Sequence, residues 1–321
     1  MTHRVLVTGG TGFVGGALVE ALCARGHALR VLALGRGPFW RPSLGVEYID
    51  GSIGDAELLK MAVAGCDVVA HLAWSTVPAS SNASPERDVS DNVVGSLRVF
   101  EACVTADVKH VLFLSSGGTV YGPPEQLPIE ESHRMAPLSS YGITKLAVEN
   151  YVRLFQNDHG LPYTILRVAN AYGEGQNPES VQGAVGVFLR RASRREAITI
   201  WGDGEVVRDY IHVSDAVGAC VRAIDVGPMN EAFNIGTGVG ASLNQLVAAI
   251  GRVLGGEPPR VERQPSRRYD VHANILNCDK ARRLLAWEPQ VVLDAGLART
   301  WRWMSSLGGT MPPRSPEQPR A

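Results

Sequence analysis

The sequence is poor in the features that mark several protein classes. Its 321 residues include five cysteines, which are scattered and form no Cys-x-x-Cys pair. We therefore expect neither a disulfide framework nor a metal site, and this usage fits a reducing compartment. The formal net charge is -1, so charge gives no reason to expect nucleic acid as a partner. No apolar run is long enough to span a bilayer. We expect a soluble, cytoplasmic protein that does not contact a membrane.

The composition is that of an ordinary globular protein. Hydrophobic residues make up 45% of the chain and charged residues 20%, which suffices for a substantial core. The length fits one large domain or two closely joined ones. Short apolar runs alternate with amphipathic stretches in the first half, which predicts an α/β fold with a doubly wound parallel (Rossmann) sheet. The expected strands cover residues 4–8, 28–34, 46–50, 67–73, 111–114 and 164–168, and the expected helices cover 16–25, 56–64, 88–106 and 138–159.

A glycine motif joins the first strand to the first helix. Gly9, Gly12 and Gly15 form a G-x-x-G-x-x-G pattern within Gly9-Gly10-Thr11-Gly12-Phe13-Val14-Gly15. A strand, a glycine turn and a helix in this order are typical of a dinucleotide site. Gly9 would allow the tight turn, Gly12 the close approach of a pyrophosphate, and Gly15 the packing of the helix. The pyrophosphate would lie at the helix N-terminus, where free N–H groups favour anions.

The acid that usually binds the adenosine ribose is missing. It is expected near the end of the second strand, about 20 residues after the glycines, where the chain has Ala33-Leu34-Gly35-Arg36. Arg36 is either a contact for the 2′-phosphate of NADP or a solvated loop arginine. The choice between NAD and NADP is therefore open.

Tyr141 and Lys145 lie four residues apart in the sequence YGITK. On a helix such residues share a face, so the phenol and the ammonium would point into the same space. Lys145 and a bound cofactor ring would each favour the phenolate and lower the pKa of Tyr141. A tyrosine with a lowered pKa can take a proton from an alcohol while hydride leaves. The spacing alone is a weak signal, and its weight depends on the motifs before it.

Other polar residues follow the strands. Ligands of doubly wound sheets bind beyond the carboxyl ends of the strands, where the glycine turn, Ala73 and residues 115–121 fall. His71 ends an apolar strand and is interpreted as a packed residue rather than a base. Asn92, inside a helical pattern, either bonds locally or steadies neighbouring backbone.

The glycine motif, HLAW at 71–74, SSGGTVYG at 115–122 and YGITK at 141–145 occur in that order. With them the chain resembles the extended short-chain dehydrogenase/reductase family, and most of all its nucleotide-sugar epimerases, dehydratases and reductases. The resemblance spans roughly residues 4–305. It implies that Tyr141 is the acid/base and that Lys145 positions the nicotinamide ribose. It also implies a tightly bound NAD or NADP, a UDP- or dTDP-linked sugar as substrate, and a homodimer formed through helices such as 88–106 and 138–159. The implied cofactor contacts are Gly9, Thr11, Gly12, Phe13, Val14, Gly15, Arg36, Ser52, Ile53, Leu72, Ala73, Trp74, Asn92, Ser115, Tyr141 and Lys145.

Two further positions depart from the family pattern. Its third catalytic residue, a Ser or Thr, falls on Gly117, so Ser116, Thr119 or an ordered water would supply the hydroxyl; of these we favour Thr119. Its adenine-contacting Asp falls on Ser52.

The second half carries the expected substrate contacts. A Gly/Pro/Gln-rich loop after residue 173 indicates a smaller domain, so we expect a dinucleotide domain at 1–169, rejoined by about 206–228, and a substrate domain at 170–205 and 229–307. Residues 308–321 show no periodic pattern and are expected to be disordered. The resemblance assigns the substrate to Thr119, Tyr121, Asn170, Trp201, Arg208 and one of Arg267 and Arg268. Asn170 is otherwise a loop-stabilising residue, and the arginine pair is otherwise solvated.

Three residues of the segment 207–215, Asp209, His212 and Asp215, are interpreted as structural, with Ser214 as a helix N-cap. The turn at 236–238 lacks the spacing of a dinucleotide site.

The expected chemistry is removal of hydride from a sugar C4 while Tyr141 takes the hydroxyl proton. A 4,6-dehydratase would need an Asp-Glu pair where this chain has Gly118-Thr119. We therefore favour a nucleotide-sugar 4-epimerase, with an NADPH-dependent 4-ketosugar reductase as the alternative. A non-catalytic NAD(P) sensor would have no use for Tyr141 and Lys145.

Overall fold

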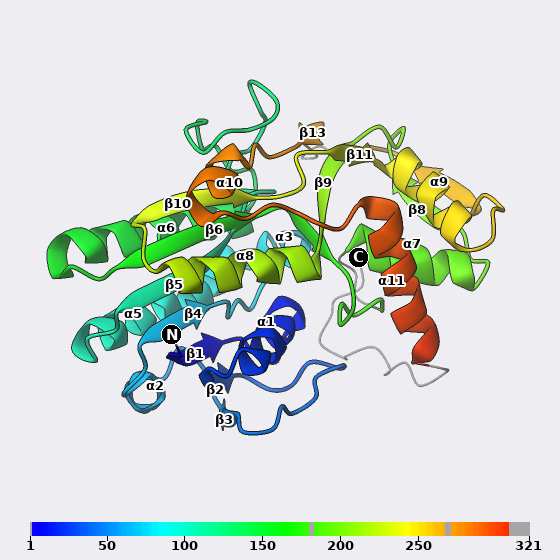
Figure 1. Cartoon of the computed structure of the whole chain (residues 1–321). Coiled ribbons are helices and arrows are strands. Elements are labelled where there is room, and N and C mark those ends of the chain that lie inside the picture. The colour runs from blue at the N-terminus through cyan, green and yellow to red at the C-terminus, as the bar shows by residue number, and fades with distance from the viewer. Residues whose placement is uncertain (1, 180–182, 267–270, 308–321) are drawn as a thin grey trace.

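The computed structural model describes residues 2–179, 183–266 and 271–307. A seven-stranded parallel sheet forms the centre of the larger part (Figure 1), with the strand order β10-β6-β5-β4-β1-β2-β3. The order reverses direction on either side of β1, as it does in doubly wound sheets. The strands are β1 (Arg4–Thr8), β2 (Ala28–Ala33), β3 (Glu47–Asp50), β4 (Val68–His71), β5 (His110–Ser116), β6 (Tyr163–Val168) and β10 (Glu231–Ile235).

Helices cover both faces of this sheet because its strands alternate their side chains between two cores. Val5 and Val7 of β1 lie in one core with α1 (Phe13–Ala24) and α8 (Val213–Val226). Leu6 lies in the other core with α2 (Ala56–Val63), α5 (Gly95–Thr105) and α6 (Ser140–His159). The predicted fold class is confirmed.

A smaller part lies beyond the carboxyl ends of the large sheet (Figure 1). Its core lies among α7, α9, α11 and the strands beside them. The strand β9 pairs with β7, β11 and β13, and β8 pairs with β12. The elements are β7 (Asn170–Tyr172), α7 (Ala184–Ser193), β8 (Ile198–Trp201), β9 (Val207–His212), β11 (Gly240–Ser242), α9 (Leu243–Val253), β12 (Val261–Gln264), β13 (Ala273–Asn274), α10 (Asp279–Leu285) and α11 (Leu293–Ser306).

Three predictions about the elements need correction. The chain stays in the large sheet beyond residue 228, because β10 pairs with β6 in parallel. The helix expected at 88–106 is composite: α4 (Pro85–Asp88) runs into a π-helical stretch, η1 (Val89–Val94), before α5, and a short α3 (Pro78–Ser81) precedes them. The N-cap of α8 is His212, whose Nδ1 accepts from the Ser214 amide at 3.2 Å, and not Ser214 itself.

Two predictions fall on residues outside the described part of the chain: the arginine pair Arg267 and Arg268, and the tail 308–321. Within the described ranges, no helix combines the length and the apolar character that crossing a bilayer requires.

Candidate active site

The glycine turn is packed so closely that larger residues would not fit at two of its positions. Gly9 has φ +73°, and a Cβ there would lie 2.8 Å from the Ala73 backbone. A Cβ on Gly15 would lie 2.2 Å from the Gly9 carbonyl oxygen. At Gly12 a Cβ would meet only that same oxygen, at 3.3 Å. The turn is thus tight on its protein side and open at Gly12, at the N-terminus of α1, which fits a pyrophosphate.

The ends of β1 and β4 are joined beside this turn. The Leu72 amide donates to the Thr8 carbonyl at 3.2 Å, and the Ala73 amide donates to Thr8 Oγ1 at 3.2 Å. His71 is fully buried between Thr8 Oγ1 and Ser96 Oγ, each 2.8 Å from a ring nitrogen. Burial, with a smaller effect of Lys145, lowers the pKa of His71 to about 3. The interpretation of His71 as a packed residue is confirmed.

A carboxylate from β3 lies beside the end of β2, and the sequence pattern did not reveal it. The Gly35 amide donates to Asp50 Oδ1 at 3.2 Å, because β2 and β3 are parallel neighbours with Ala33 opposite Asp50. Thr11 Oγ1 donates to the Gly35 carbonyl at 3.0 Å. The Arg36 guanidinium lies over the Trp40 ring, 4.6 Å from its centroid. An acid is therefore present at the place where the motif lacks one, supplied by the next strand.

The other residues expected near the cofactor stabilise turns around it. Ser52 Oγ accepts from the Gly54 amide at 3.0 Å. Ile53 packs on Gly95, where a Cβ would come within 2.7 Å of Ile53 Cδ1. Asn92, in η1, accepts from the Ser75 amide at 2.8 Å. Asn92 therefore steadies neighbouring backbone, which is one of the two roles expected of it.

Tyr141 and Lys145 lie in the first two turns of α6, whose N-cap Ser139 accepts from the Gly142 amide at 3.2 Å. Lys145 is buried, and its Nζ donates to the Leu114 carbonyl at 2.7 Å. The same Nζ lies 3.6 Å from the centroid of the Trp74 ring and 5.8 Å from that of Tyr141. Burial lowers the pKa of Lys145 to about 7, against the opposing effects of Glu149 and Asp88.

The predicted lowering of the pKa of Tyr141 by Lys145 is wrong for the protein on its own. Burial, and then the charge of Asp88, raise the pKa of Tyr141 above its ordinary value, while a hydrogen bond with the Ser116 side chain lowers it. Lys145 is directed at Leu114 and Trp74, so its ammonium does not offset the burial of the phenol. The Trp74 and Tyr141 rings meet edge to face, with centroids 6.0 Å apart.

Ser116, rather than Thr119, is the hydroxyl that affects the pKa of Tyr141. Ser116 is the last residue of β5 and its side chain lowers the pKa of Tyr141, whereas Thr119 Oγ1 is buried without a hydrogen-bond partner in the described part of the chain. A Cβ on Gly117 would lie 2.5 Å from Leu276 Cδ1, so the family serine does not fit there without displacement. A Cβ on Gly118 would lie 3.2 Å from Asn170 Oδ1 and 4.0 Å from Ser116 Oγ, so Asn170 does reach this loop.

Two residues expected to touch ligands use their side chains inside the core. The Tyr121 hydroxyl donates to Asn234 Oδ1 at 2.6 Å and accepts from Arg167 Nη1 at 2.8 Å. Ser115 Oγ donates to Glu149 Oε1 at 2.6 Å. Tyr121 is wholly buried and Ser115 nearly so. This corrects the expectation that these two side chains point at ligands. Each instead satisfies the buried Arg167–Glu149 ion pair, whose charged atoms lie 2.7 Å apart, since buried charges need such partners.

Of the remaining substrate candidates, Arg208 is linked to the loop 115–122 through its strand neighbour. It stands opposite Asn274 of β13, whose Nδ2 donates to the Gly117 carbonyl at 3.1 Å. Arg208 Nη1 donates to the Val271 carbonyl at 2.7 Å. Trp201 ends β8, is partly exposed and stands opposite Gln264.

The structural interpretation of the 207–215 segment is confirmed. Asp209 accepts from the Thr237 and Gly238 amides at 2.8 and 3.1 Å, so it holds the glycine turn at 236–238. Asp215 accepts from the Val291 amide at 2.9 Å.

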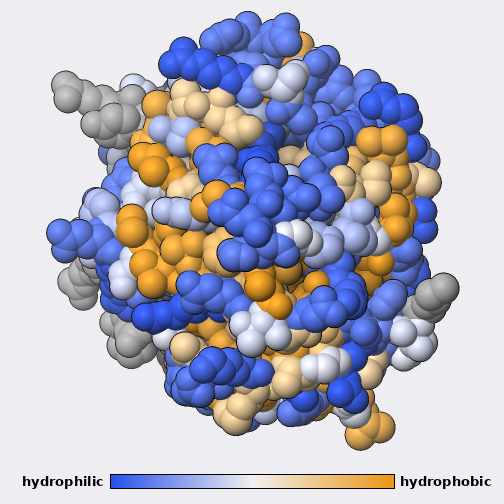
Figure 2. Space-filling model, turned by 90° about the vertical axis from the view of Figure 1, so that its left-hand side faces the viewer, coloured by the Kyte–Doolittle hydropathy of each residue, from blue (hydrophilic) through white to orange (hydrophobic). Residues whose placement is uncertain are grey.

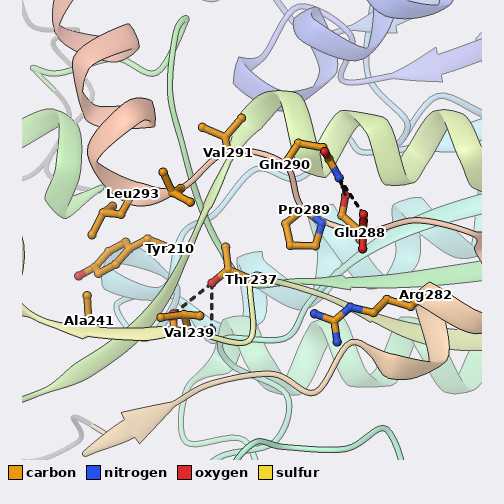
Figure 3. A pocket seen from close by; sticks show the side chains of 11 residues that line it. Tyr210, Thr237, Val239, Ala241, Arg282, Glu288, Pro289, Gln290, Val291 and Leu293 are labelled. Atoms are coloured by element: carbon orange, nitrogen blue, oxygen red, sulfur yellow. Dashed lines mark hydrogen bonds between the residues drawn. The ribbon is translucent and has the colours of Figure 1, made fainter.

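Two pockets are prominent in the described part of the chain. One of about 360 Å³ borders Gly10 to Phe13 and continues along the exposed side of α1. The other, of about 320 Å³, is lined by Tyr210, the turn at 237–241 and the linker 288–293 (Figure 3). No expected catalytic or cofactor residue lines this second pocket.

The model of the NAD dependent epimerase/dehydratase family matches residues 5–236. The chain belongs to this family. A UDP-glucose 4-epimerase of Mycolicibacterium smegmatis is 36% identical over 304 residues, which are 92% of this chain and 97% of that protein. A dTDP-4-dehydro-6-deoxyglucose reductase of Escherichia coli is 32% identical over 307 residues, 92% of this chain and 95% of that protein. The crystal structure of the UDP-glucose 4-epimerase of Thermotoga maritima with UDP-glucose has a TM-score of 0.88 and 36% identity, and the match covers 94% of this chain and 99% of that one. As a member of this NAD-dependent epimerase/dehydratase family the protein is an enzyme, and Tyr141, Lys145 and the glycine turn stand in one region of it.

Proposed function

We propose that the protein is a nucleotide-sugar 4-epimerase acting on a UDP- or dTDP-linked hexose or 6-deoxyhexose. The observation that carries this proposal is the position of Tyr141: its ring meets Trp74 edge to face, with centroids 6.0 Å apart, and the Ser116 side chain at the carboxyl end of β5 lowers its pKa. That end lies on the same edge of the sheet as the glycine turn, where ligands of doubly wound folds bind. These positions support a role for the Tyr141 phenol in proton transfer beside the cofactor.

A bound nicotinamide dinucleotide would supply the acceptor and donor of hydride for the sugar C4. Tyr141 takes the proton of the C4 hydroxyl as that carbon is oxidised, and returns one when the 4-keto sugar is reduced on its other face. Ser116 donates to the phenolate oxygen and holds it in place. Lys145, fixed by the Leu114 carbonyl, would bind the nicotinamide ribose and favour the phenolate when the site is filled.

The substrate contacts in this proposal are Thr119, Asn170, Trp201, Arg208 and one of Arg267 and Arg268. The buried, unpartnered Thr119 Oγ1 and the nearby Asn170 supply polar groups next to Ser116. The arginines suit a diphosphate because a guanidinium presents paired donors. The relative from Thermotoga maritima was solved with UDP-glucose, which makes this sugar the first to test.

We propose NAD rather than NADP as the cofactor. The Asp50 carboxylate lies at the end of β2, within 3.2 Å of the Gly35 amide, and it would repel a 2′-phosphate there. The Arg36 guanidinium stacks on Trp40. An NADPH-dependent 4-ketosugar reductase is the second candidate, supported by the likeness to the Escherichia coli reductase. A 4,6-dehydratase is disfavoured by Gly118 and Thr119.

A homodimer is proposed through α5 and α6. Exposed apolar side chains follow one side of α6, with Ile143 55%, Tyr151 37% and Leu154 46% exposed, and their spacing of 8 and 11 residues keeps them on one helical face. Figure 2 views the side at which α5 and α6 end in Figure 1, and apolar patches lie there among charged side chains. Light scattering would test this: Leu154→Glu should yield monomers, and a monomeric wild type would contradict it.

The proposed function is tested with purified protein and no added dinucleotide. UDP-glucose, UDP-galactose and dTDP-glucose are incubated separately and followed by proton NMR, with Tyr141→Phe as the matched control. We expect interconversion of C4 epimers by the wild type alone, and NAD in the supernatant after denaturation. A protein without dinucleotide that consumes a 4-ketosugar only with added NADPH is a reductase, and one that exchanges no hydride with any sugar is a sensor.

A further inference from the structure

A buried carboxylate outside the predicted site gathers donors from both sides of the helix that carries Tyr141. Asp88, the last residue of α4, is fully buried. Its Oδ1 accepts from Thr76 Oγ1 and, at 2.8 Å, from Asn92 Nδ2. Its Oδ2 accepts from Ser140 Oγ at 2.6 Å and Thr144 Oγ1 at 3.1 Å. Four hydroxyl and amide groups thus surround one buried carboxyl group, two from the segment 75–92 and two from α6, where the Thr144 hydroxyl also lies 3.0 Å from the Ser140 carbonyl.

The two donors on α6 flank the catalytic pair. Ser140 and Thr144 are four residues apart and share a face, directly beside the face that carries Tyr141 and Lys145. The backbone of the same turn is held by the neighbouring helix as well. The Ser140 amide donates to Asn82 Oδ1 at 2.8 Å, and the Tyr141 amide donates to Ser81 Oγ at 3.0 Å.

We propose that Asp88 is a positioning residue. Its carboxylate fixes the first two turns of α6 against the segment 75–92 and so holds Tyr141 and Lys145 in the orientations that catalysis requires. This inference rests on the proposed function for its kinetic consequence. The geometry itself does not depend on which sugar is bound. A displacement of about 1 Å in a reacting group costs up to about 10²-fold in rate.

The charge of Asp88 reaches both members of the pair. It raises the pKa of Tyr141 and, after Glu149, is the second group that raises the pKa of Lys145. His71 on β4 is a further titratable neighbour of Lys145, and the burial that lowers the pKa of His71 keeps its ring neutral. Removal of the Asp88 charge is therefore expected to lower the pKa of Lys145.

The substitution Asp88→Asn tests the proposal, because an amide offers one acceptor oxygen where the carboxylate offers two. With the epimerised sugar we expect kcat to fall by about 10²-fold with little change in KM, and the pH profile to shift. Asp91→Asn is the matched control: Asp91 lies three residues further on, bonds Ser75 Oγ and Arg87, and is partly exposed. Ser140→Ala removes one tether and keeps the charge, so it should lower kcat without shifting the pH profile.

A second measurement needs neither sugar nor cofactor. The Trp74 ring lies 3.6 Å from Lys145 Nζ, so its fluorescence should follow the titration of Lys145, and the step lost in Trp74→Phe identifies that signal. We expect a midpoint near pH 7 in the wild type, and a lower midpoint in Asp88→Asn but not in Asp91→Asn or Ser140→Ala. An unchanged midpoint in folded Asp88→Asn, or kcat within twofold of wild type, overturns the proposal. If Asp88→Asn does not fold, Ser140→Ala with wild-type kcat overturns it. If the wild type shows no turnover but Asp88→Asn still lowers the midpoint, the epimerase proposal is refuted and the positioning role of Asp88 stands.

Discussion

Lys145→Met should stabilise the protein at neutral pH, and by an amount that depends on pH in a defined way. Burial lowers the pKa of Lys145 from 10.5 to about 7. A fall of this size corresponds to a cost of roughly 5 kcal/mol for keeping the ammonium inside the folded protein. Methionine has a similar length and carries no charge, so it does not incur this cost.

The sign follows from proton binding. Between pH 7 and 10.5 the unfolded chain holds the Lys145 proton and the folded protein does not, so wild-type stability rises with pH in this window. The cost is constant below about pH 7 and shrinks above it by about 1.4 kcal/mol per pH unit. The lost bond to the Leu114 carbonyl adds a destabilising offset of about 1–3 kcal/mol, which does not change with pH.

Urea unfolding of both proteins at intervals from pH 6 to 9.5 measures this difference. We expect the advantage of Lys145→Met over wild type to be constant up to about pH 7 and then to fall by about 3 kcal/mol over two pH units. Lys60→Met, at an exposed position paired with Glu57, is the matched control and should show no such slope. Parallel stability curves for wild type and Lys145→Met would refute the reasoning.

Three further predictions follow from single contacts. Asp50→Asn should shift the ratio of dissociation constants toward NADP, measured by calorimetry on dinucleotide-free protein, and an unchanged ratio would contradict the assignment of Asp50. Gly117→Ala should lower the free energy of unfolding by about 1–3 kcal/mol, because its Cβ would lie 2.5 Å from Leu276 Cδ1 and 2.9 Å from the Arg167 carbonyl oxygen; a fully stable variant would speak against this packing. Tyr121→Phe should cost about 1–3 kcal/mol of stability and leave the KM for the nucleotide sugar unchanged, whereas a raised KM would restore Tyr121 to the substrate site.

The parts of the site that lie within one strand–turn–helix unit were accessible from the sequence. The glycine turn and the Tyr141–Lys145 pair depend on spacings of three and four residues, which fix geometry locally. His71 was also interpreted correctly, because the end of an apolar strand is buried and a charged imidazole ring there would lack hydration. The doubly wound sheet followed from the alternation of strands and helices.

The parts that depend on neighbours distant in the chain were not accessible. Asp50 reaches the end of β2 only through the pairing of β2 with β3. The choice of Ser116 over Thr119 depends on the direction of each side chain at the end of β5 and in the loop that follows, and the sequence does not encode that direction by spacing. Lys145 is directed to Leu114 and Trp74 by tertiary packing, which overrode the local i,i+4 argument for the pKa of Tyr141.

The central claim is that Tyr141 takes the C4 hydroxyl proton while the hydrogen on C4 leaves and returns as hydride within one active site. UDP-glucose deuterated at C4 tests it, with wild type and Tyr141→Phe compared by proton NMR of the products. We predict that wild type yields UDP-galactose with the deuterium still on C4, and that Tyr141→Phe binds the sugar but forms almost no product. Turnover retained in Tyr141→Phe, or deuterium lost from C4 to the solvent, would contradict the account.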